Sequence, residues 1–231
     1  MAKKTKVDNP KSLKNVENTL TRTEQFLEEN YKPILIFLGV LVILVGLFYL
    51  RKIYLGNKNS EAQSQMYMAE RWFEMDSLNL ALYGDGNYLG FIDIANDYKS
   101  TKAGNMAKYA AGICFLHLGR YEEALEYLTK YSPKEKMIGS LAIGATGDAL
   151  VELERFDEGI EKYLEAAEKG NNSFSSPLFL MKAGQIYELQ EKYPEALSIY
   201  ERIKNKYPES TEGSMAEKYI ARVKVLMHQN Q

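Results

Sequence analysis

The chain has 231 residues, 45 % of them hydrophobic and 26 % charged, which is enough for one soluble domain beside a membrane segment. The part from Asn59 onward carries 19 Lys and Arg against 26 Asp and Glu, a net charge of −7. Such an acidic domain is a poor candidate for binding nucleic acid, which requires clustered positive charge.

The chain opens with a basic arm, which we place at residues 1–32. Residues 1–11 lack the apolar side chains of a core, so we expect them to be disordered. Ser12 is a candidate N-cap for a short helix, because apolar residues then recur at helical spacing: Leu13, Val16, Leu20 and Leu27. Two interpretations stay open, an amphipathic helix beside the membrane or a partner, and a weakly helical spacer.

Residues Ile34 to Leu50 form seventeen consecutive positions without a charged or strongly polar side chain. At about 1.5 Å per residue the run is roughly 26 Å long, so flanking residues must complete a span of the roughly 30 Å hydrocarbon core. Suitable interfacial residues lie on both sides: Tyr31, Lys32, Tyr49, Arg51, Lys52 and Tyr54. We predict a transmembrane helix over 33–53. It is an uncleaved anchor rather than a signal peptide, because the run begins only after 33 residues and no small-x-small site follows.

Two features of the span bear on its partners and its orientation. Gly39 and Gly46 share one helix face, where they would let another helix approach closely or are ordinary membrane glycines. Seven basic residues precede the span and three closely follow it, which favours an N-terminus inside the cell. Within the nearest twenty residues the count is tied at three each, so charge alone leaves the orientation open.

After the span we expect a polar linker over 54–60, with Ser60 as the N-cap of the first helix of a domain over 61–231. The segment Gly84-Asp85-Gly86-Asn87 has the composition of a tight turn. It lacks the Lys-Ser/Thr pair and the preceding strand of a phosphate-binding loop.

A repeat is the most specific signal in this domain. Gly112, Gly147 and Gly184 follow one another at intervals of 35 and 37 residues. Each is preceded by a small residue and followed, at fixed offsets, by further residues of one kind: Phe115, Leu150 and Tyr187; Tyr121, Phe156 and Tyr193; Ala124, Gly159 and Ala196; Leu128, Tyr163 and Tyr200. Small residues let two helices of a hairpin cross closely, and large ones fill the gap to the next hairpin.

This pattern resembles the tetratricopeptide repeat, a helix-turn-helix unit near 34 residues long. The resemblance implies an all-α fold in which the transmembrane helix precedes an α-solenoid with a capping helix. Its repeats lie near 66–100, 105–138, 140–172 and 177–210, and the cap over 213–229. The first repeat is divergent and is supported by the echo of IANDYKST in IKNKYPEST. The family's turn glycine stands at Gly119 but is replaced by Glu154 and Glu191.

No catalytic or metal-binding arrangement is evident. His117 and His228 lack the spacing of a metal pair, and no nucleophile elbow or Cys-His arrangement occurs. Cys114, the single cysteine, lies on an apolar helical face and is expected to be a buried structural thiol. We therefore expect no enzyme, no cofactor and no small-molecule substrate.

The resemblance also implies that partners bind the concave groove formed by the first helix of each repeat. The family's groove positions correspond here to Tyr109, Ile113, His117, Gly144, Asp148, Glu152, Met181, Gln185 and Leu189. The Lys and Asn residues that clamp a C-terminal carboxylate in chaperone-tail-binding members are absent, so that mode is not expected. The mixture of apolar side chains and acids suits an apolar or extended polypeptide.

The order of basic arm, single span and repeat domain resembles the YfgM-type ancillary subunits of the Sec translocon. This resemblance implies a bacterial inner-membrane protein with a cytoplasmic N-terminus and a periplasmic solenoid, whose partners are translocon subunits, emerging polypeptides or periplasmic chaperones. The alternative is a membrane-anchored assembly scaffold for another envelope complex, such as cell-division or outer-membrane biogenesis machinery. An inverted topology with a cytoplasmic solenoid is a third possibility.

Overall fold

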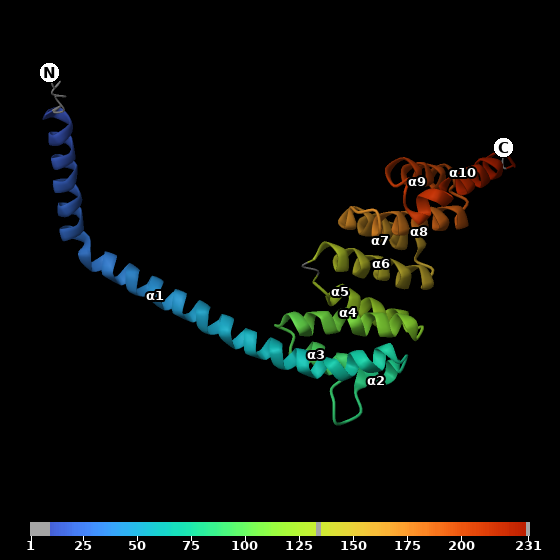
Figure 1. Cartoon of the computed structure of the whole chain (residues 1–231), viewed down its shortest axis with the longest axis horizontal. Helices are drawn as coiled ribbons and strands as arrows, with labels where there is room; N and C mark the ends of the chain where they lie inside the picture. The colour runs from blue at the N-terminus through green and yellow to red at the C-terminus, as the bar shows by residue number, and fades with distance from the viewer. Residues whose placement is uncertain (1–9, 133–134, 230–231) are drawn as a thin grey trace, which may run out of the picture. The chain divides into compact units, whose positions relative to one another are not determined.

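The computed structural model describes residues 10–132 and 135–229, without the side chains of 10–25 and 27–29. All regular secondary structure in this part of the chain is helical. The helices are α1 (Pro10–Glu74), α2 (Leu78–Tyr83), α3 (Phe91–Asp97), α4 (Lys102–His117), α5 (Tyr121–Lys130), α6 (Lys136–Glu152), α7 (Phe156–Gly170), α8 (Ser175–Leu189), α9 (Tyr193–Lys206) and α10 (Thr211–Gln229) (Figure 1). Residues 1–9 lie outside this description, and so do the side chains of Leu13, Val16, Leu20 and Leu27. Helix α1 begins at Pro10, so the disorder expected over 1–11 does not extend to Pro10 and Lys11, and Ser12 lies inside the helix rather than at its N-cap.

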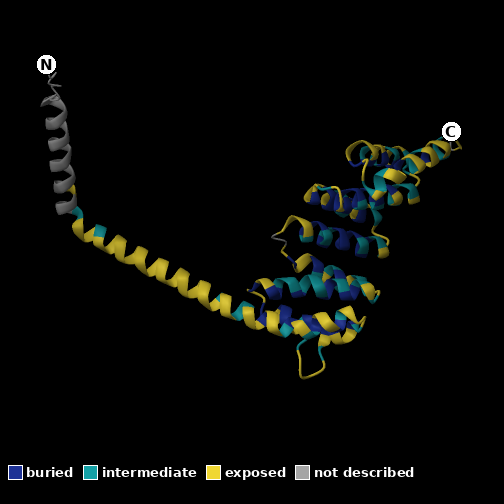
Figure 2. Cartoon of the chain, viewed as in Figure 1, coloured by how far each residue is buried: buried dark blue, intermediate teal, exposed yellow. Residues whose placement is uncertain are grey.

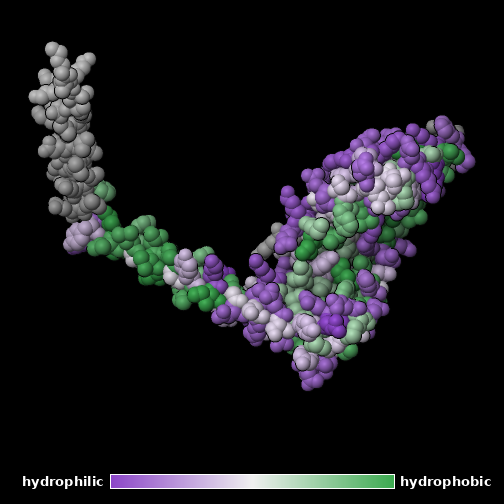
Figure 3. Space-filling model, viewed as in Figure 1, coloured by the Kyte–Doolittle hydropathy of each residue, from purple (hydrophilic) through white to green (hydrophobic). Residues whose placement is uncertain are grey.

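The chain forms two compact units, Met1–Tyr54 and Leu55–Gln231. In the first unit, α1 carries the apolar run, and its side chains are almost all exposed (Figures 2 and 3). Leu35, Phe37 and Val42 each expose more than 60 % of their surface. Among the described helices this is the one long and apolar enough to cross a membrane, by length and composition. Gly39 and Gly46 have no neighbouring atom within 4 Å of an added Cβ.

The second unit begins inside α1, which corrects one expectation. Residues 54–60 are helical rather than a linker, and Ser60 lies in the helix interior rather than at its N-cap. The polar composition of this segment reflects solvent exposure and contacts with the domain. The side-chain oxygen of Asn59 accepts the backbone N–H of Ala103 at 3.0 Å.

Helical hairpins build the second unit. In the first hairpin, the last turns of α1 and helix α3 contribute to one hydrophobic cluster. After it, α4 pairs with α5, α6 with α7 and α8 with α9, while α10 packs on α9 and α8 (Figure 1). In the first hairpin, the short helix α2 and the loop at Gly84 and Asp85 are inserted between the two partners. The carboxylate of Asp85 accepts the backbone N–H groups of Asn87 and Tyr88, both at 2.9 Å, which closes the tight turn expected there.

In the three hairpins that follow the first, close approach of the two helices depends on glycine. A Cβ atom added at the repeat glycine would lie inside the van der Waals radius of the large residue sixteen positions later. The pairs are Gly112 with Leu128 (2.6 Å), Gly147 with Tyr163 (2.8 Å) and Gly184 with Tyr200 (2.5 Å). In each of these hairpins, the recurring glycine of the first helix therefore contacts the recurring large residue of the second helix.

The turn inside each hairpin has one geometry, with a residue in the left-handed region. These residues are Asp76 (φ 56°), Gly119 (φ 70°), Glu154 (φ 60°) and Glu191 (φ 59°). The next residue's N–H returns to the carbonyl five positions earlier, as in Arg120 to Phe115 at 2.9 Å and Lys192 to Tyr187 at 2.9 Å. This is the Schellman arrangement, which usually takes glycine at the left-handed position. The chain keeps the turn where glycine is absent.

The similar segments IANDYKST and IKNKYPEST form the same type of junction between two helices. Thr101 Oγ1 accepts the N–H of Gly104 at 2.9 Å and donates to the carbonyl of Tyr98 at 2.8 Å. The corresponding bonds later in the chain join Ser210 to Gly213 (2.9 Å) and Ser210 to Tyr207 (2.8 Å). The hydroxyl thus caps the new helix and holds the end of the preceding one.

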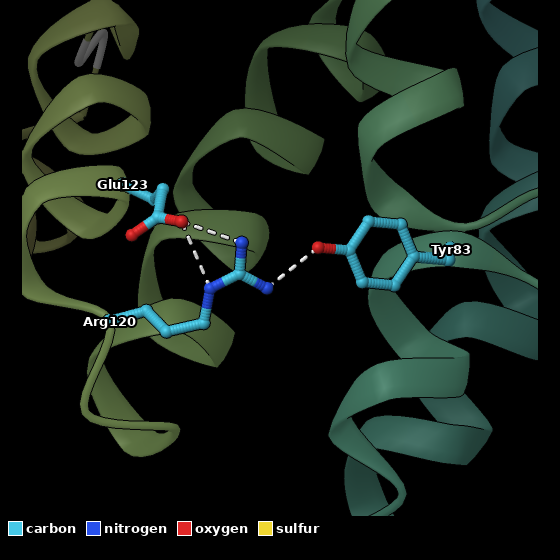
Figure 4. A network of polar contacts seen from close by, with 3 residues as sticks. All are labelled: Tyr83, Arg120 and Glu123. Carbon is cyan, nitrogen blue, oxygen red and sulfur yellow. Dashed lines mark hydrogen bonds and ion pairs between the residues drawn. The ribbon is translucent and has the colours of Figure 1, made fainter.

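A polar contact links the insertion in the first hairpin to the second hairpin (Figure 4). The guanidinium of Arg120, at the start of α5, donates to Tyr83 Oη at 2.7 Å and to Glu123 Oε1 at 2.6 and 3.0 Å. Arg120 also lies over the ring of Phe115 at 4.6 Å. Arg120, which directly follows the left-handed residue Gly119, therefore links α2 to α5.

The left-handed glutamates generate a stability prediction. We expect Glu191→Gly to raise the free energy of unfolding by about 1 kcal/mol, because a non-glycine residue pays roughly 1–2 kcal/mol in this region and glycine's added chain entropy offsets part of the gain. The measurement is urea unfolding of the full chain in detergent. The matched control is Glu161→Gly, in the exposed interior of α7, which should lose about 1 kcal/mol. A loss at Glu191 would contradict the strain.

Candidate functional site

The groove positions expected from the sequence do not share one environment. Tyr109 and Ile113 are half-buried and pack against the core, whereas His117 is exposed near the ring of Phe73. Gln185 and Glu152 are exposed, and so is Leu189. These positions lie on α4, α6 and α8, the first helices of three successive hairpins (Figure 1).

Met181 and Gly144 are corrections to the predicted groove. Met181 is 5 % exposed and belongs to the hydrophobic core, so it offers no surface to a partner. Gly144 is buried under Phe179, whose ring carbon would lie 2.0 Å from an added Cβ. Both positions are therefore covered by packing inside the solenoid.

Three predicted groove residues, Asp148, Glu152 and Gln185, line one cavity of about 420 Å³, which we call the α6–α8 cavity. Side chains that the sequence did not single out for the groove complete its wall: Leu116, Tyr121, Val151, Tyr163, Lys182 and Ile186. A second cavity of about 400 Å³ lies between the last turns of α1 and helix α4, lined by Gln63, Met66, Glu70, Lys102, Ala103 and Met106.

Asp148 is the centre of the polar contacts in the α6–α8 cavity. Its Oδ1 atom accepts the hydroxyl of Tyr163 at 2.6 Å and the ammonium of Lys182 at 2.6 Å. The same ammonium lies 5.6 Å from the centre of the Tyr163 ring. The acid of α6, the tyrosine of α7 and the lysine of α8 thus form one contact that joins two successive hairpins.

The same arrangement recurs one repeat later. Glu188 Oε1 accepts the hydroxyl of Tyr200 at 2.5 Å and the guanidinium of Arg222 at 2.7 Å. In both cases the cation lies 34 residues after the acid. A charge of opposite sign 34 residues after the acid is therefore the signal in the sequence that indicates both contacts.

Burial and the neighbouring acids change the pKa of these tyrosines. The pKa of Tyr163 is raised far above its usual value. Burial is the largest cause, and the negative charge of Asp148 and the hydrogen bond to its carboxylate add to it. The pKa of Tyr200 is raised in the same way by burial and its hydrogen bond to Glu188. Both phenols therefore stay protonated and act as hydrogen-bond donors. The pKa of Tyr121, at the rim, is raised by its hydrogen bond to Glu152.

Neither the thiol nor the titratable side chains form a reactive centre in the part of the chain that is described. Cys114 is fully buried, and burial raises its pKa to about 12, which keeps it a thiol at neutral pH. Within residues 10–132 and 135–229, no group of three or more His, Cys, Asp and Glu side chains could hold a metal ion.

Comparison with known proteins agrees with this architecture. Residues 94–134 and 145–211 match the family model of the tetratricopeptide repeat. None of the curated proteins matches the sequence. A crystal structure of a Podospora anserina protein, described as a kinesin light chain with nearly identical TPR-like repeats, is similar with a TM-score of 0.57 at 14 % identity, over 74 % of this chain and 88 % of that one. The predicted all-α solenoid of tetratricopeptide-like repeats is confirmed.

The tyrosine contacts generate a pH prediction. Tyrosines of the unfolded chain lose their protons near pH 10, whereas Tyr163 and Tyr200 keep theirs in the folded state because their pKa is raised. Their contribution to stability is present below pH 10 and is lost as the pH rises above it, by up to about 1.4 kcal/mol per pH unit for each tyrosine.

The measurement is the free energy of unfolding between neutral pH and about pH 11. Tyr163→Phe should make the decline above pH 10 shallower, although it lowers stability at neutral pH by about 1–2 kcal/mol because Asp148 loses a donor. Tyr67→Phe, at an exposed position of α1, is the control and should leave the slope as it is. An unchanged slope in Tyr163→Phe would contradict the assignment.

Proposed function

We propose that this chain, whose solenoid consists of tetratricopeptide repeats, is a membrane-anchored protein-interaction module. The observation that carries the proposal is the pairing of an uncovered apolar helix with a repeat domain whose groove contains open cavities. The helix provides attachment to a bilayer, and the solenoid provides the surface for a protein partner.

The exposure of the apolar run supports the anchor. Side chains from Leu35 to Leu50 are exposed along the helix, and none of its most apolar stretch is buried. In water, an exposed apolar surface of this extent is unfavourable, and such surfaces mark membrane or protein contacts. A lipid bilayer would cover every face of a helix that satisfies its own backbone hydrogen bonds. Within that helix, Gly39 and Gly46 are proposed as positions where a partner helix packs.

The composition of the groove supports a polypeptide as partner. The surface formed by α4, α6 and α8 combines apolar side chains, such as Ile113 and Leu116, with acids, and Figure 3 shows an apolar region bordered by hydrophilic residues. Repeat solenoids use such extended surfaces for protein recognition. We place the partner contacts at Tyr109, Ile113, His117, Asp148, Glu152 and Gln185.

The finer proposal rests on the resemblance of the chain's layout to YfgM-type subunits. In that case the arm is cytoplasmic, the solenoid is periplasmic, and the protein stands beside the Sec translocon, where it meets emerging chains or recruits chaperones. The greater number of basic residues before the span favours the same orientation. A scaffold for another envelope complex would also have a membrane anchor and a binding groove. It would not require this particular span and arm, because it would not dock on the translocon through them.

Orientation can be tested with cysteine labelling, since Cys114 is buried and gives little background. We expect Ser173→Cys, exposed on the solenoid, to react with a membrane-impermeant maleimide in bacterial cells whose outer membrane alone has been permeabilised. Thr5→Cys, in the arm, should react only after the inner membrane is lysed. The reverse pattern would establish the inverted topology, and labelling of neither variant before lysis would exclude a periplasmic solenoid.

Translocon association predicts a loss on exchange of the anchor. Tagged full-length protein, purified from membranes in a mild detergent, should carry translocon subunits that mass spectrometry identifies. Replacing the residues before Ser60 with an unrelated membrane anchor should abolish this recovery, because a translocon subunit docks through its span and arm. Recovery of a different envelope complex that survives the exchange would overturn the translocon proposal and favour the scaffold.

A further inference from the structure

We propose that the α6–α8 cavity accepts the side chain of an arginine from an extended polypeptide lying in the groove. This inference rests on the proposed function of the groove and names the chemistry of its partner. The proposed occupant is a cationic side chain with apolar neighbours in its peptide, and not an acidic tail or a C-terminal carboxylate.

The wall of the cavity suits the long stem of such a side chain. Leu116, Val151 and Ile186 come from α4, α6 and α8 and line one cavity with Glu152 and Asp148. Arginine and lysine lay their methylene groups along apolar surface while the charged head reaches a polar partner. The combination of three aliphatic side chains and two carboxylates in one cavity matches that division.

The carboxylates still have acceptor capacity. Both contacts of Asp148 are made to its Oδ1 atom, and in the described part of the chain no hydrogen bond reaches Oδ2. Glu152 is exposed at the rim, where Tyr121 donates to it. A guanidinium offers five N–H donors in a planar fork, which suits two acceptors better than the ammonium of lysine does.

Charge favours a cation over an anion at this place. The cavity holds two acids and one lysine, and the lysine is already paired with Asp148 at 2.6 Å. The residues from Asn59 onward carry a net charge of −7, which attracts a basic segment over a longer range and repels an acidic one. An acidic peptide would have to displace Asp148 from Lys182 without any free cation in the cavity wall.

Lys182 is a built-in competitor for the same carboxylate. Its ammonium neutralises one of the two acids, so an incoming arginine meets one net negative charge rather than two. Removing the charge of Lys182 while keeping its stem should therefore strengthen the binding of a cation. If the Asp148–Lys182 pair only stabilised the fold, removing the charge of Lys182 would instead weaken the binding of a cation.

The test uses full-length protein in lipid nanodiscs, which in the proposed topology keep the basic arm and the solenoid on opposite faces. The probe is a short fluorescein-labelled peptide of alternating leucine and serine with one central arginine, measured by fluorescence anisotropy. Matched peptides carry citrulline, which has the shape of arginine without its charge, or glutamate. We expect the citrulline peptide to bind about tenfold more weakly and the glutamate peptide more weakly still.

Three variants locate the binding. Glu152→Gln should weaken the arginine peptide about fivefold, and Lys182→Met should strengthen it about threefold, each with little effect on the citrulline peptide. Glu161→Gln, an exposed acid of α7 outside the cavity, removes the same charge as Glu152→Gln and should change binding less than twofold. Circular dichroism shows whether each variant keeps its helical fold.

The outcomes separate this inference from the proposed function. Equal binding of the arginine and citrulline peptides, or weaker binding in Lys182→Met, would overturn the arginine site while leaving a peptide-binding groove. Failure of all three peptides to bind would overturn both the arginine site and the groove as a peptide site. The membrane anchor and the translocon association would still be decided by labelling and co-purification.

Discussion

The solenoid depends on the absence of a side chain at three helical glycines. Gly112, Gly147 and Gly184 let the large residues Leu128, Tyr163 and Tyr200 pack directly on the backbone of the partner helix. A methyl group at any of them would overlap the ring or branched carbon of its partner, and crowded cores respond with strain and backbone shifts. Because the tyrosines are held so close, their hydroxyls reach Asp148 and Glu188 on the same first helices. The packing contact and the polar contact are thus consequences of one geometric condition.

Much of this fold follows from spacing alone. The spacing predicts helical hairpins, because a glycine is followed by a large residue sixteen positions later in each repeat, with small residues between them. Such a constant offset is expected where the small and large residues face each other on two paired helices. The turns are a harder case. Glu154 and Glu191 adopt the left-handed conformation that glycine favours, and they do so because the two helices on either side hold the turn in place. Local preference is overridden there by tertiary packing.

The candidate site could be predicted only in part. Asp148, Glu152 and Gln185 line one cavity, but Met181 is buried in the core, because the residue type alone does not reveal which side chains the packing of the helices covers. Lys182 was not foreseen, since its role arises from a residue one whole repeat away. The polar segment 54–60 is helical rather than a linker, because polar composition indicates exposure to solvent and an exposed helix face tolerates polar residues.

Among the described residues of the second unit, the helices in contact belong to the same hairpin or to neighbouring ones. Such a quasi-one-dimensional structure loses order from its ends, since a terminal helix has a neighbour on one side only. At the first hairpin, Asn59, Glu61 and Tyr83 accept hydrogen bonds from residues 37 to 44 positions later, which hold that end in place. At the other end, α10 is retained by its packing on α9 and α8, by the Arg222–Glu188 contact and by the exposed ion pairs Lys204–Glu217 and Lys224–Glu201, which contribute little because solvent screens them. Amide protons of α10 should therefore exchange with solvent fastest among the long helices of the solenoid, and a protease should shorten the array from that side one helix at a time.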